Sequence, residues 1–297
     1  MKNFVIYTAI VGEYDEISQP LVVDDRFDYI LFSNDIKVPK VGVWRVRPIN
    51  YYNVVQTKIA RWVKTHPEEL LPEYECSVWL DARIIIKSQY IYDKTVELYD
   101  SKNILSLQTN PDFNCIYKEM IRMLFLQWEE ESVILSWGHH LREENYPRNI
   151  GTKETGLLYR KHSDKTIKQF DELWWWCIEN YSRRDQFSFN YVLWKLKITS
   201  NSFLPDVLGV RTSKYLCLNN HTNHKNKKIS EGKCSLLLHY YYRHADETNI
   251  IVNAYYWIYG RKNPKLWLGI VGIIFAVKHV VMRCLGKKNN YEYKKTI

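Results

Sequence analysis

A polar triplet, Asp81-Ala-Arg83, directly follows the apolar run Cys76 to Leu80. Such a run is typical of a buried strand, and open α/β sheets bind ligands where their strands end. The Asp81 carboxylate could hold a divalent cation against a diphosphate, because hard cations prefer oxygen ligands. Two structural roles explain Asp81 equally well, a helix N-cap and an ion pair with Arg83.

Strands and helices that would position this triplet alternate along the chain. Short β-branched and aromatic runs predict strands over 4–11, 29–33, 43–46, 76–80, 104–108 and 155–160. Apolar residues at helical spacing predict helices over 54–65, 90–99, 116–128, 164–180 and 187–196. This alternation predicts an α/β fold, a mostly parallel sheet flanked by helices, in one domain over residues 1–260.

The formal net charge of +9 is concentrated at the C-terminus. From Arg261 onward there are nine Lys and Arg and one acid, Glu292, which gives +8. The rest of the chain has 33 basic and 32 acidic residues, or +1. Because this part is nearly neutral and contains no zinc finger or ribonucleoprotein motif, we expect no nucleic acid among the partners.

Residues 261–297 are both basic and apolar. The stretch 266–277 is apolar on every face, but it is shorter than the roughly 20 residues of a clean membrane span. We predict a C-terminal membrane-associated helix that lies in an anionic membrane surface. A buried core helix and a single spanning helix are the alternatives.

The compartment is predicted from the cysteines and the N-terminus. Six scattered cysteines without a C-x-x-C pair indicate a reducing environment. The apolar run after Phe4 is too short for a signal peptide and is soon followed by Glu13. We therefore expect a peripheral or monotopic protein at the cytoplasmic face of the inner or plasma membrane.

Five motifs follow one another along the chain: Tyr7-Thr-Ala-Ile-Val-Gly-Glu-Tyr-Asp15, Phe32-Ser-Asn-Asp35, Thr57-Lys-Ile-Ala-Arg61, Ser77-Val-Trp-Leu-Asp-Ala82 and Arg184-Asp-Gln-Phe-Ser-Phe189. With His66-Pro67, they resemble a glycosyltransferase-like family, with a hexosyltransferase-like domain, of bacterial polysaccharide clusters and plant pectin and mucilage proteins. The resemblance covers residues 4–245. The layout is also distantly similar to the retaining galactosyltransferases of glycosyltransferase family eight.

This resemblance implies a GT-A-like, nucleotide-sugar-binding sheet. The implied reaction moves a sugar from a nucleotide-diphosphate donor to a saccharide acceptor in capsule- or O-antigen-type polysaccharide synthesis. The membrane-suited C-terminus favours a lipid-linked acceptor. Asp185 and Gln186 would lie beside the anomeric carbon of the transferred sugar. If the reaction inverts configuration, Glu119, Glu154 or Asp185 could be the general base. The implied donor-binding residues are Thr8, Ala9, Ile10, Gly12, Tyr14, Asp35, Lys58, Arg61, Asp81, Arg83 and Gly156.

Arg83 departs from the pattern of the family-eight relatives, which have a second metal-binding Asp at this place. Mn²⁺ or Mg²⁺ could still be held by Asp81, His239 and the diphosphate. Alternatively, the Arg83 guanidinium could itself neutralise the diphosphate through a bidentate contact. Both interpretations stay open.

Other patterns favour no competing enzyme. The sequence contains no Gly-x-Ser-x-Gly elbow, P-loop or Rossmann glycine fingerprint, which disfavours a hydrolase, a kinase and a dehydrogenase. His139 and His140 follow Gly138 and are predicted to lie in a loop that ends a helix. Cys217, His221, His224 and Cys234 are of zinc-ligand types but fall in a stretch typical of a solvated loop. The alternative to an enzyme is a catalytically silent GT-A-like protein that binds a saccharide or lipid at the membrane.

Overall fold

The structure of the chain is a computed structural model that describes residues 3–12, 15–126, 128–205 and 209–219 and the separate residues 270, 273, 277, 280, 281 and 284. It divides into two compact units, Met1–Ile116 with Leu141–Lys227, and Tyr117–His140 with Lys228–Ile297. The boundary predicted after residue 260 lies outside the described residues.

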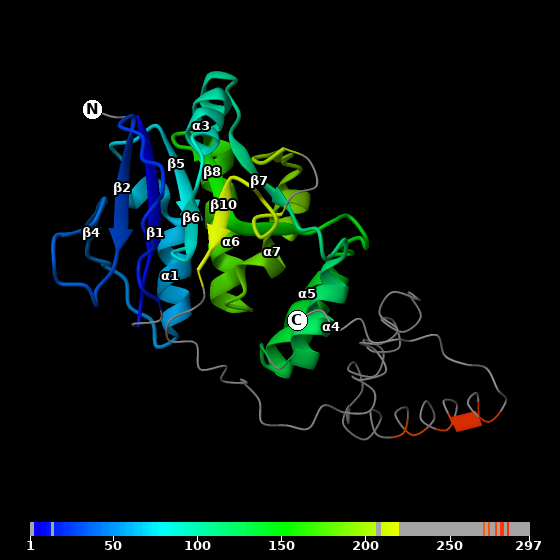
Figure 1. Cartoon of the computed structure of the whole chain (residues 1–297). Coiled ribbons are helices and arrows are strands. Elements are labelled where there is room, and N and C mark those ends of the chain that lie inside the picture. The colour runs from blue at the N-terminus through cyan, green and yellow to red at the C-terminus, as the bar shows by residue number, and fades with distance from the viewer. Residues whose placement is uncertain are drawn as a thin grey trace. The chain divides into compact units, whose positions relative to one another are not determined.

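The first unit is built on an eight-stranded sheet with the order β3-β4-β2-β1-β5-β8-β7-β9 (Figure 1). Its strands are β1 (Phe4–Ala9), β2 (Phe27–Phe32), β3 (Lys40–Val41), β4 (Trp44–Arg47), β5 (Cys76–Leu80), β7 (Leu105–Thr109), β8 (Lys153–Lys161) and β9 (Asn201–Ser202). A separate antiparallel pair is formed by β6 (Ile84–Ile86) and β10 (Leu216–Leu218).

The centre of the large sheet is parallel. Strand β1 pairs in parallel with β2 and β5, and β2 pairs in parallel with β4. Strand β8 runs antiparallel to both β5 and β7. The predicted α/β class with a mostly parallel sheet is therefore confirmed, and the arrangement is consistent with a GT-A-like fold.

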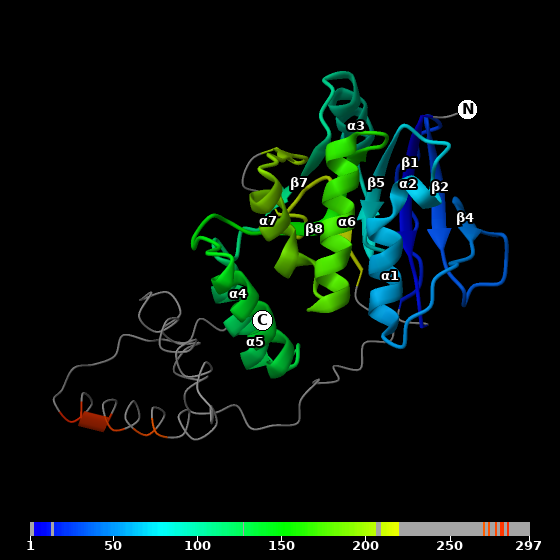
Figure 2. The same ribbon diagram turned by 180° about the vertical axis from the view of Figure 1, so that it is seen from behind.

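Helices lie on both faces of this sheet. The described helices of the first unit are α1 (Gln56–Thr65), α2 (Pro67–Leu70), α3 (Tyr90–Asp100), α6 (Lys165–Asn180) and α7 (Asp185–Leu196), whereas α4 (Ile116–Leu126) and most of α5 (Glu131–Glu143) belong to the second unit. Figure 2 shows α1 and α6 side by side on one face. Successive side chains of a strand point to opposite faces, so Tyr7 reaches α1, whereas Ile6 packs in the core with Tyr92 of α3.

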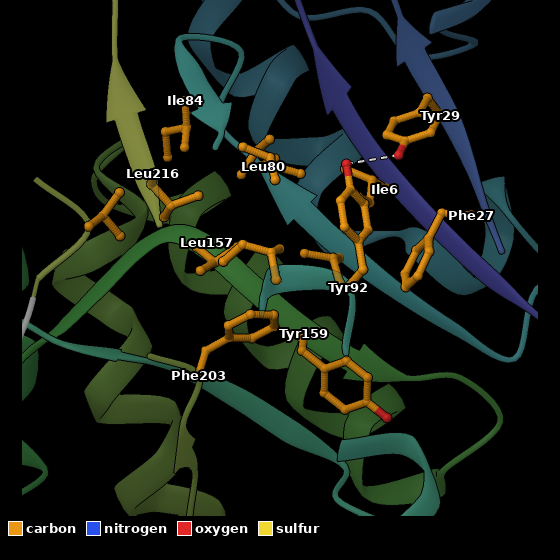
Figure 3. Close-up of a cluster of buried hydrophobic side chains, with 14 of the residues drawn as sticks. Ile6, Phe27, Tyr29, Leu80, Ile84, Tyr92, Leu157, Tyr159, Phe203 and Leu216 are labelled. Atoms are coloured by element: carbon orange, nitrogen blue, oxygen red, sulfur yellow. Dashed lines mark hydrogen bonds between the residues drawn. The ribbon is translucent and has the colours of Figure 1, made fainter. Parts of the chain in front are cut away.

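The core beneath α3 is apolar and aromatic. It joins side chains of β1, β2, β5, β8 and α3, among them Ile6, Phe27, Leu80, Tyr159 and Tyr92 (Figure 3). The one polar link drawn there is the hydrogen bond of 2.9 Å that the Tyr29 hydroxyl donates to the Tyr92 hydroxyl. Burial of this surface stabilises the sheet that holds the functional residues.

The histidine pair shows where prediction and structure differ. His139 and His140 lie inside α5, so their predicted place in a loop is wrong. Gly138 resembles a helix C-terminus in the sequence, but the helix continues through it. Ile134, Trp137 and Leu141 are buried at helical spacing, and this periodicity was the signal for the helix.

Little of the predicted membrane segment is described. Ile270, Ile273, Val277, Val280 and Val281 are each helical and exposed. Within the described residues, no helix has the length and apolar character needed to cross a bilayer.

Candidate functional site

Two carboxylates far apart in the chain meet at one lysine. The ammonium Nζ of Lys64 lies 2.5 Å from Oδ2 of Asp185 and 3.7 Å from Oδ1 of Asp81. Asp81 follows β5 and Asp185 begins α7. We call Asp81, Asp185, Lys64 and Arg61 the carboxylate–lysine cluster.

Strand β8 brings its first residues to the end of β5, because the two strands are antiparallel. The Asp81 N–H donates to the Gly156 carbonyl at 2.9 Å. A Cβ at Gly156 would lie 3.2 Å from Oδ2 of Asp81 and 3.1 Å from the end of Ile84, so glycine permits this close approach. The indole N–H of Trp79 donates to Oδ1 of Asp81 at 2.8 Å and orients the carboxylate.

Asp81 is neither a helix N-cap nor the ion-pair partner of Arg83, the two structural roles considered from the sequence. The strand β6, not a helix, follows it, and its ion pair is with Lys64 rather than Arg83. The Asp81 side chain is 36% exposed. A ligand can therefore reach it.

Lys64 is a fully buried residue in the last turn of α1. Helical side chains lean toward the N-terminus of their helix, which directs the ammonium back toward the strand ends. It lies over the rings of Trp79 and Trp174, 5.2 and 5.7 Å from their centres. Burial lowers the pKa of Lys64, against the opposing effect of Asp185 and Asp81. Two carboxylates and two aromatic faces act in the opposite direction and favour the charged form.

Asp185 is only 4% exposed, and other groups hold both of its oxygens. Oδ2 also accepts from the Thr155 hydroxyl at 2.8 Å, and Oδ1 lies 3.2 Å from Nε of Arg61. Burial raises the pKa of this carboxyl, but the charges of Arg61 and Lys64 outweigh burial and hold the pKa below its usual range. Asp185 is therefore ionised at neutral pH and enclosed by its partners.

A second group of predicted donor-binding residues lies at the ends of β1 and β2. The Gly12 N–H donates to Oδ2 of Asp35 at 2.6 Å, which joins the two loops. Gly12 has φ +73°, and a Cβ there would collide with the side chain of Gln56, the first residue of α1. This glycine therefore allows the loop after β1 to pass close to α1.

Thr8, Ala9 and Ile10 belong to the same end of β1 but are buried. Thr8 is fully enclosed, and its hydroxyl has no hydrogen-bond partner among the described residues. In this conformation the side chain of Thr8 does not reach a ligand. Tyr14, predicted beside them, lies outside the described residues.

Four further predicted residues have contacts away from Lys64. The Lys58 ammonium donates to the Glu179 carbonyl in the last turn of α6 at 2.6 Å, and the Gln186 amide donates to the Lys153 carbonyl at 3.4 Å. Glu154 accepts the N–H of Val210 at 2.6 Å, and burial raises its pKa. The Arg83 carbonyl accepts the N–H of Asn219 at 2.9 Å, and its half-buried side chain forms no ion pair with another described residue.

Sequence reasoning missed Lys64 and Thr155. Arg61 and Lys64 are three residues apart on a helix, which places them on the same face, and this spacing was the available signal for the lysine. Thr155 precedes Gly156, a predicted donor-binding residue, but the sequence indicated no role for its side chain. Its contact with Asp185 depends on where β8 begins relative to α7.

The described part of the chain does not fit a divalent cation. It holds no group of three or more His, Cys, Asp or Glu side chains arranged for a metal. His239, the predicted second ligand, lies outside the described residues. Around Asp81, the neighbouring charge is the Lys64 ammonium, a cation in place of a further ligand.

Comparisons with known proteins come from both structure and sequence. The apo structure of the bifunctional glycosyltransferase WbbM is similar with a TM-score of 0.36 and 11% identity. The likeness covers 68% of this chain and 38% of that chain, and it is too distant to bear on function. No curated protein matches the sequence significantly. The family model described as TOD1/MUCI70, glycosyltransferase-like domain, matches residues 1–214. The chain therefore belongs to the TOD1/MUCI70 glycosyltransferase-like domain family.

Proposed function

We propose that this protein transfers a sugar from a nucleoside-diphosphate donor to a saccharide acceptor. Membership of a glycosyltransferase-like family supports transfer in general. The observation that carries the proposal is the convergence of Asp81 and Asp185 on Lys64 where β5 ends. Open α/β sheets bind nucleotides at such strand ends.

Glycosyl transfer develops positive charge on the sugar and negative charge on the departing diphosphate. In our proposal, the guanidinium groups of Arg61 and Arg83 receive the diphosphate. Arg61 is 23% exposed and lies beside Oδ1 of Asp185, so an incoming diphosphate competes for it. This competition frees Oδ1 to face the sugar. Gln186, which follows Asp185 in the chain, remains the predicted sugar-binding residue, and Glu154 remains the predicted base.

We further propose that the acceptor is lipid-linked and that the reaction takes place at the cytoplasmic face of a membrane, in polysaccharide synthesis. The support for this part is the basic, apolar segment from Arg261 onward and the exposed apolar residues within it. A membrane-bound enzyme meets a lipid-linked acceptor in two dimensions, which raises its effective concentration.

The test is a titration of the purified full chain with UDP- and GDP-sugars, followed by nucleotide release in the presence of saccharide acceptors. One donor should bind and turn over. Asp81→Asn should lower turnover by about a hundredfold, the scale for one group that stabilises transition-state charge. Asp100→Asn, an exposed aspartate at the end of α3, is the matched control and should leave turnover unchanged. Absence of binding and turnover with every donor would refute the proposal.

One observation favours the second candidate, a catalytically silent saccharide- or lipid-binding protein. Lys64, Arg61 and Thr155 enclose Asp185 and occupy both of its oxygens. A silent protein would bind saccharide or nucleotide sugar without releasing nucleotide. Polysaccharide production in cells separates the two, because a folded Asp185→Asn variant that abolishes production contradicts the silent protein.

A further inference from the structure

We propose that Lys64 is the built-in cation of this site: its ammonium takes the place of a divalent cation between Asp81 and Asp185, and donor binding requires no metal. The statement that donor binding requires no metal rests on the proposed function. The statement that Lys64 takes the place of a cation between Asp81 and Asp185 does not, and it can be tested with a metal ion alone.

Most carboxylate oxygens of the cluster already have partners. Asp185 Oδ2 receives Lys64 and Thr155, and Asp185 Oδ1 lies 3.2 Å from Arg61. Asp81 Oδ1 accepts from Trp79 and lies 3.7 Å from the ammonium. Oδ1 of Asp185 and Oδ2 of Asp81 accept no hydrogen bond from another described residue. The Arg61 guanidinium lies against the first of these oxygens, which leaves Oδ2 of Asp81, and a divalent cation requires several oxygen ligands.

The charges of the cluster also oppose the binding of a metal ion. Two carboxylates face two cations, Lys64 and Arg61, and the cluster is therefore neutral before any ligand arrives. A divalent ion bound between the carboxylates would lie next to a fully buried ammonium, and repulsion between like charges is strong where water is excluded. The ammonium and a metal therefore exclude one another.

A bound diphosphate requires positive charge, which Arg83 can supply in place of a metal ion. Arg83, two residues after Asp81, forms no ion pair with another described residue. Its guanidinium is available for a bidentate contact with phosphate oxygens. Lys64 thus holds the carboxylates while Arg83, together with Arg61, receives the ligand charge, two tasks that one metal ion would combine.

The first experiment measures Mn²⁺ binding to the wild-type chain and to Asp81→Asn by electron paramagnetic resonance of free Mn²⁺. We expect both proteins to give the same result, because the carboxylate pair does not bind the ion. Wild-type binding that disappears in Asp81→Asn would overturn the proposal. This comparison requires neither a donor nor a change at a buried position.

The second experiment removes the cation. Lys64→Gln leaves two carboxylates without an ammonium, and we expect its melting temperature to rise when Mn²⁺ is added, unlike that of the wild type. The rise should disappear in Lys64→Gln/Asp81→Asn. Lys94→Gln is the matched control, because it removes a lysine that pairs with Glu97 at 2.6 Å on the surface of α3. Its melting temperature should not rise when Mn²⁺ is added. A purely structural lysine would produce no gain of metal response, and that result would contradict the proposal.

The third experiment compares donor binding in EDTA and in Mn²⁺. Equal affinity supports the proposal, and binding that occurs only with Mn²⁺ overturns it. Binding in neither condition counts against the glycosyltransferase function instead, while the two Mn²⁺ experiments still decide the role of Lys64. If Lys64→Gln does not fold, the comparison of the wild type with Asp81→Asn decides whether the carboxylate pair binds a metal.

Discussion

Two buried ionisable side chains of the first unit, Asp185 and His162, are held in single charge states by their surroundings. Asp185 is kept ionised by Arg61 and Lys64. His162, two residues after Arg160 in the chain, is kept neutral. Its Nδ1 lies 2.9 Å from the Tyr74 carbonyl, and Nε2 lies 2.8 Å from the Ser77 hydroxyl. Because a carbonyl only accepts, Nδ1 carries the hydrogen and Nε2 accepts from Ser77.

This state of His162 predicts a loss of stability in mild acid. Burial, helped by the charge of Arg160, lowers the pKa of His162 to about 4. An unfolded histidine has a pKa near 6.5, so between these values the unfolded chain binds a proton that the folded chain refuses. His162 should therefore lower the free energy of unfolding as the pH falls from 6.5 to 4, by up to about 3 kcal/mol.

Urea unfolding at several pH values checks this prediction. His162→Gln keeps a donor for Tyr74 and an acceptor for Ser77 but does not titrate, so the difference between wild type and variant isolates the histidine. The variant should lose less stability between pH 6.5 and 4 than the wild type. If the free energies of unfolding of the two proteins fell equally with pH, His162 would not contribute to the loss of stability in acid.

The types of the functional residues were more predictable than their partners. A carboxylate after a buried strand is visible in sequence, and Asp81 lies at the strand end as expected. A buried lysine is not visible, because lysine is among the residues least often buried and usually marks a solvated helix face. The partner of Asp185 depends on the packing of α1 against α7 and β8, which no short sequence window contains.

At the scale of elements, the last turn of α1 is tied to β1, β8 and α6 by one arginine. Arg160 is fully buried and lies 2.5 Å from Oδ1 of Asp171. It also donates to the Tyr7 hydroxyl and to the Lys64 carbonyl. The Tyr7 hydroxyl donates to the same carbonyl at 3.0 Å. These bonds fix the backbone from which the Lys64 side chain reaches the carboxylates.

We predict that Arg160→Leu destabilises the chain more than Arg160→Leu/Asp171→Leu. The single variant leaves the Asp171 carboxylate buried without its cation, which costs about 3–5 kcal/mol, whereas removal of both charges leaves no unpaired ion. Free energies of unfolding measured in urea give the comparison. Equal destabilisation by the single and double variants would mean that the ion pair is not the reason for the loss.

Element positions followed from local patterns, but strand direction did not. The run 76–80 and β5 coincide, because a continuous apolar run of that length suits a strand buried on both faces. The run 155–160 was found as a strand, yet nothing in its residues shows that it is antiparallel to β5. Direction is set by the connections before and after a strand. It decides that Thr155 and Gly156, rather than Arg160, lie beside Asp81.

At the scale of the whole molecule, charge and exposed apolar surface coincide in the C-terminal segment. Residues before Arg261 have a net charge of +1 and those from Arg261 onward have +8. Ile270, Ile273, Val277, Val280 and Val281 are exposed, and their spacing places them on one face of a helix. Exposed apolar residues within a basic segment favour a helix that lies in an anionic membrane surface.

We therefore predict that the full chain cosediments with vesicles that contain anionic lipid. Ile273→Asp/Val280→Asp should weaken this binding by about tenfold or more, because each substitution removes part of the 1.5–3 kcal/mol that a buried apolar side chain contributes. Val38→Asp/Val54→Asp is the matched control, because both residues are exposed in the first unit and the charge change is equal. Added salt should weaken wild-type binding as it screens the basic residues. Equal binding by both double variants would mean that other residues make the membrane contact. Failure of the wild type to bind would refute the membrane proposal but would not bear on the proposed donor site.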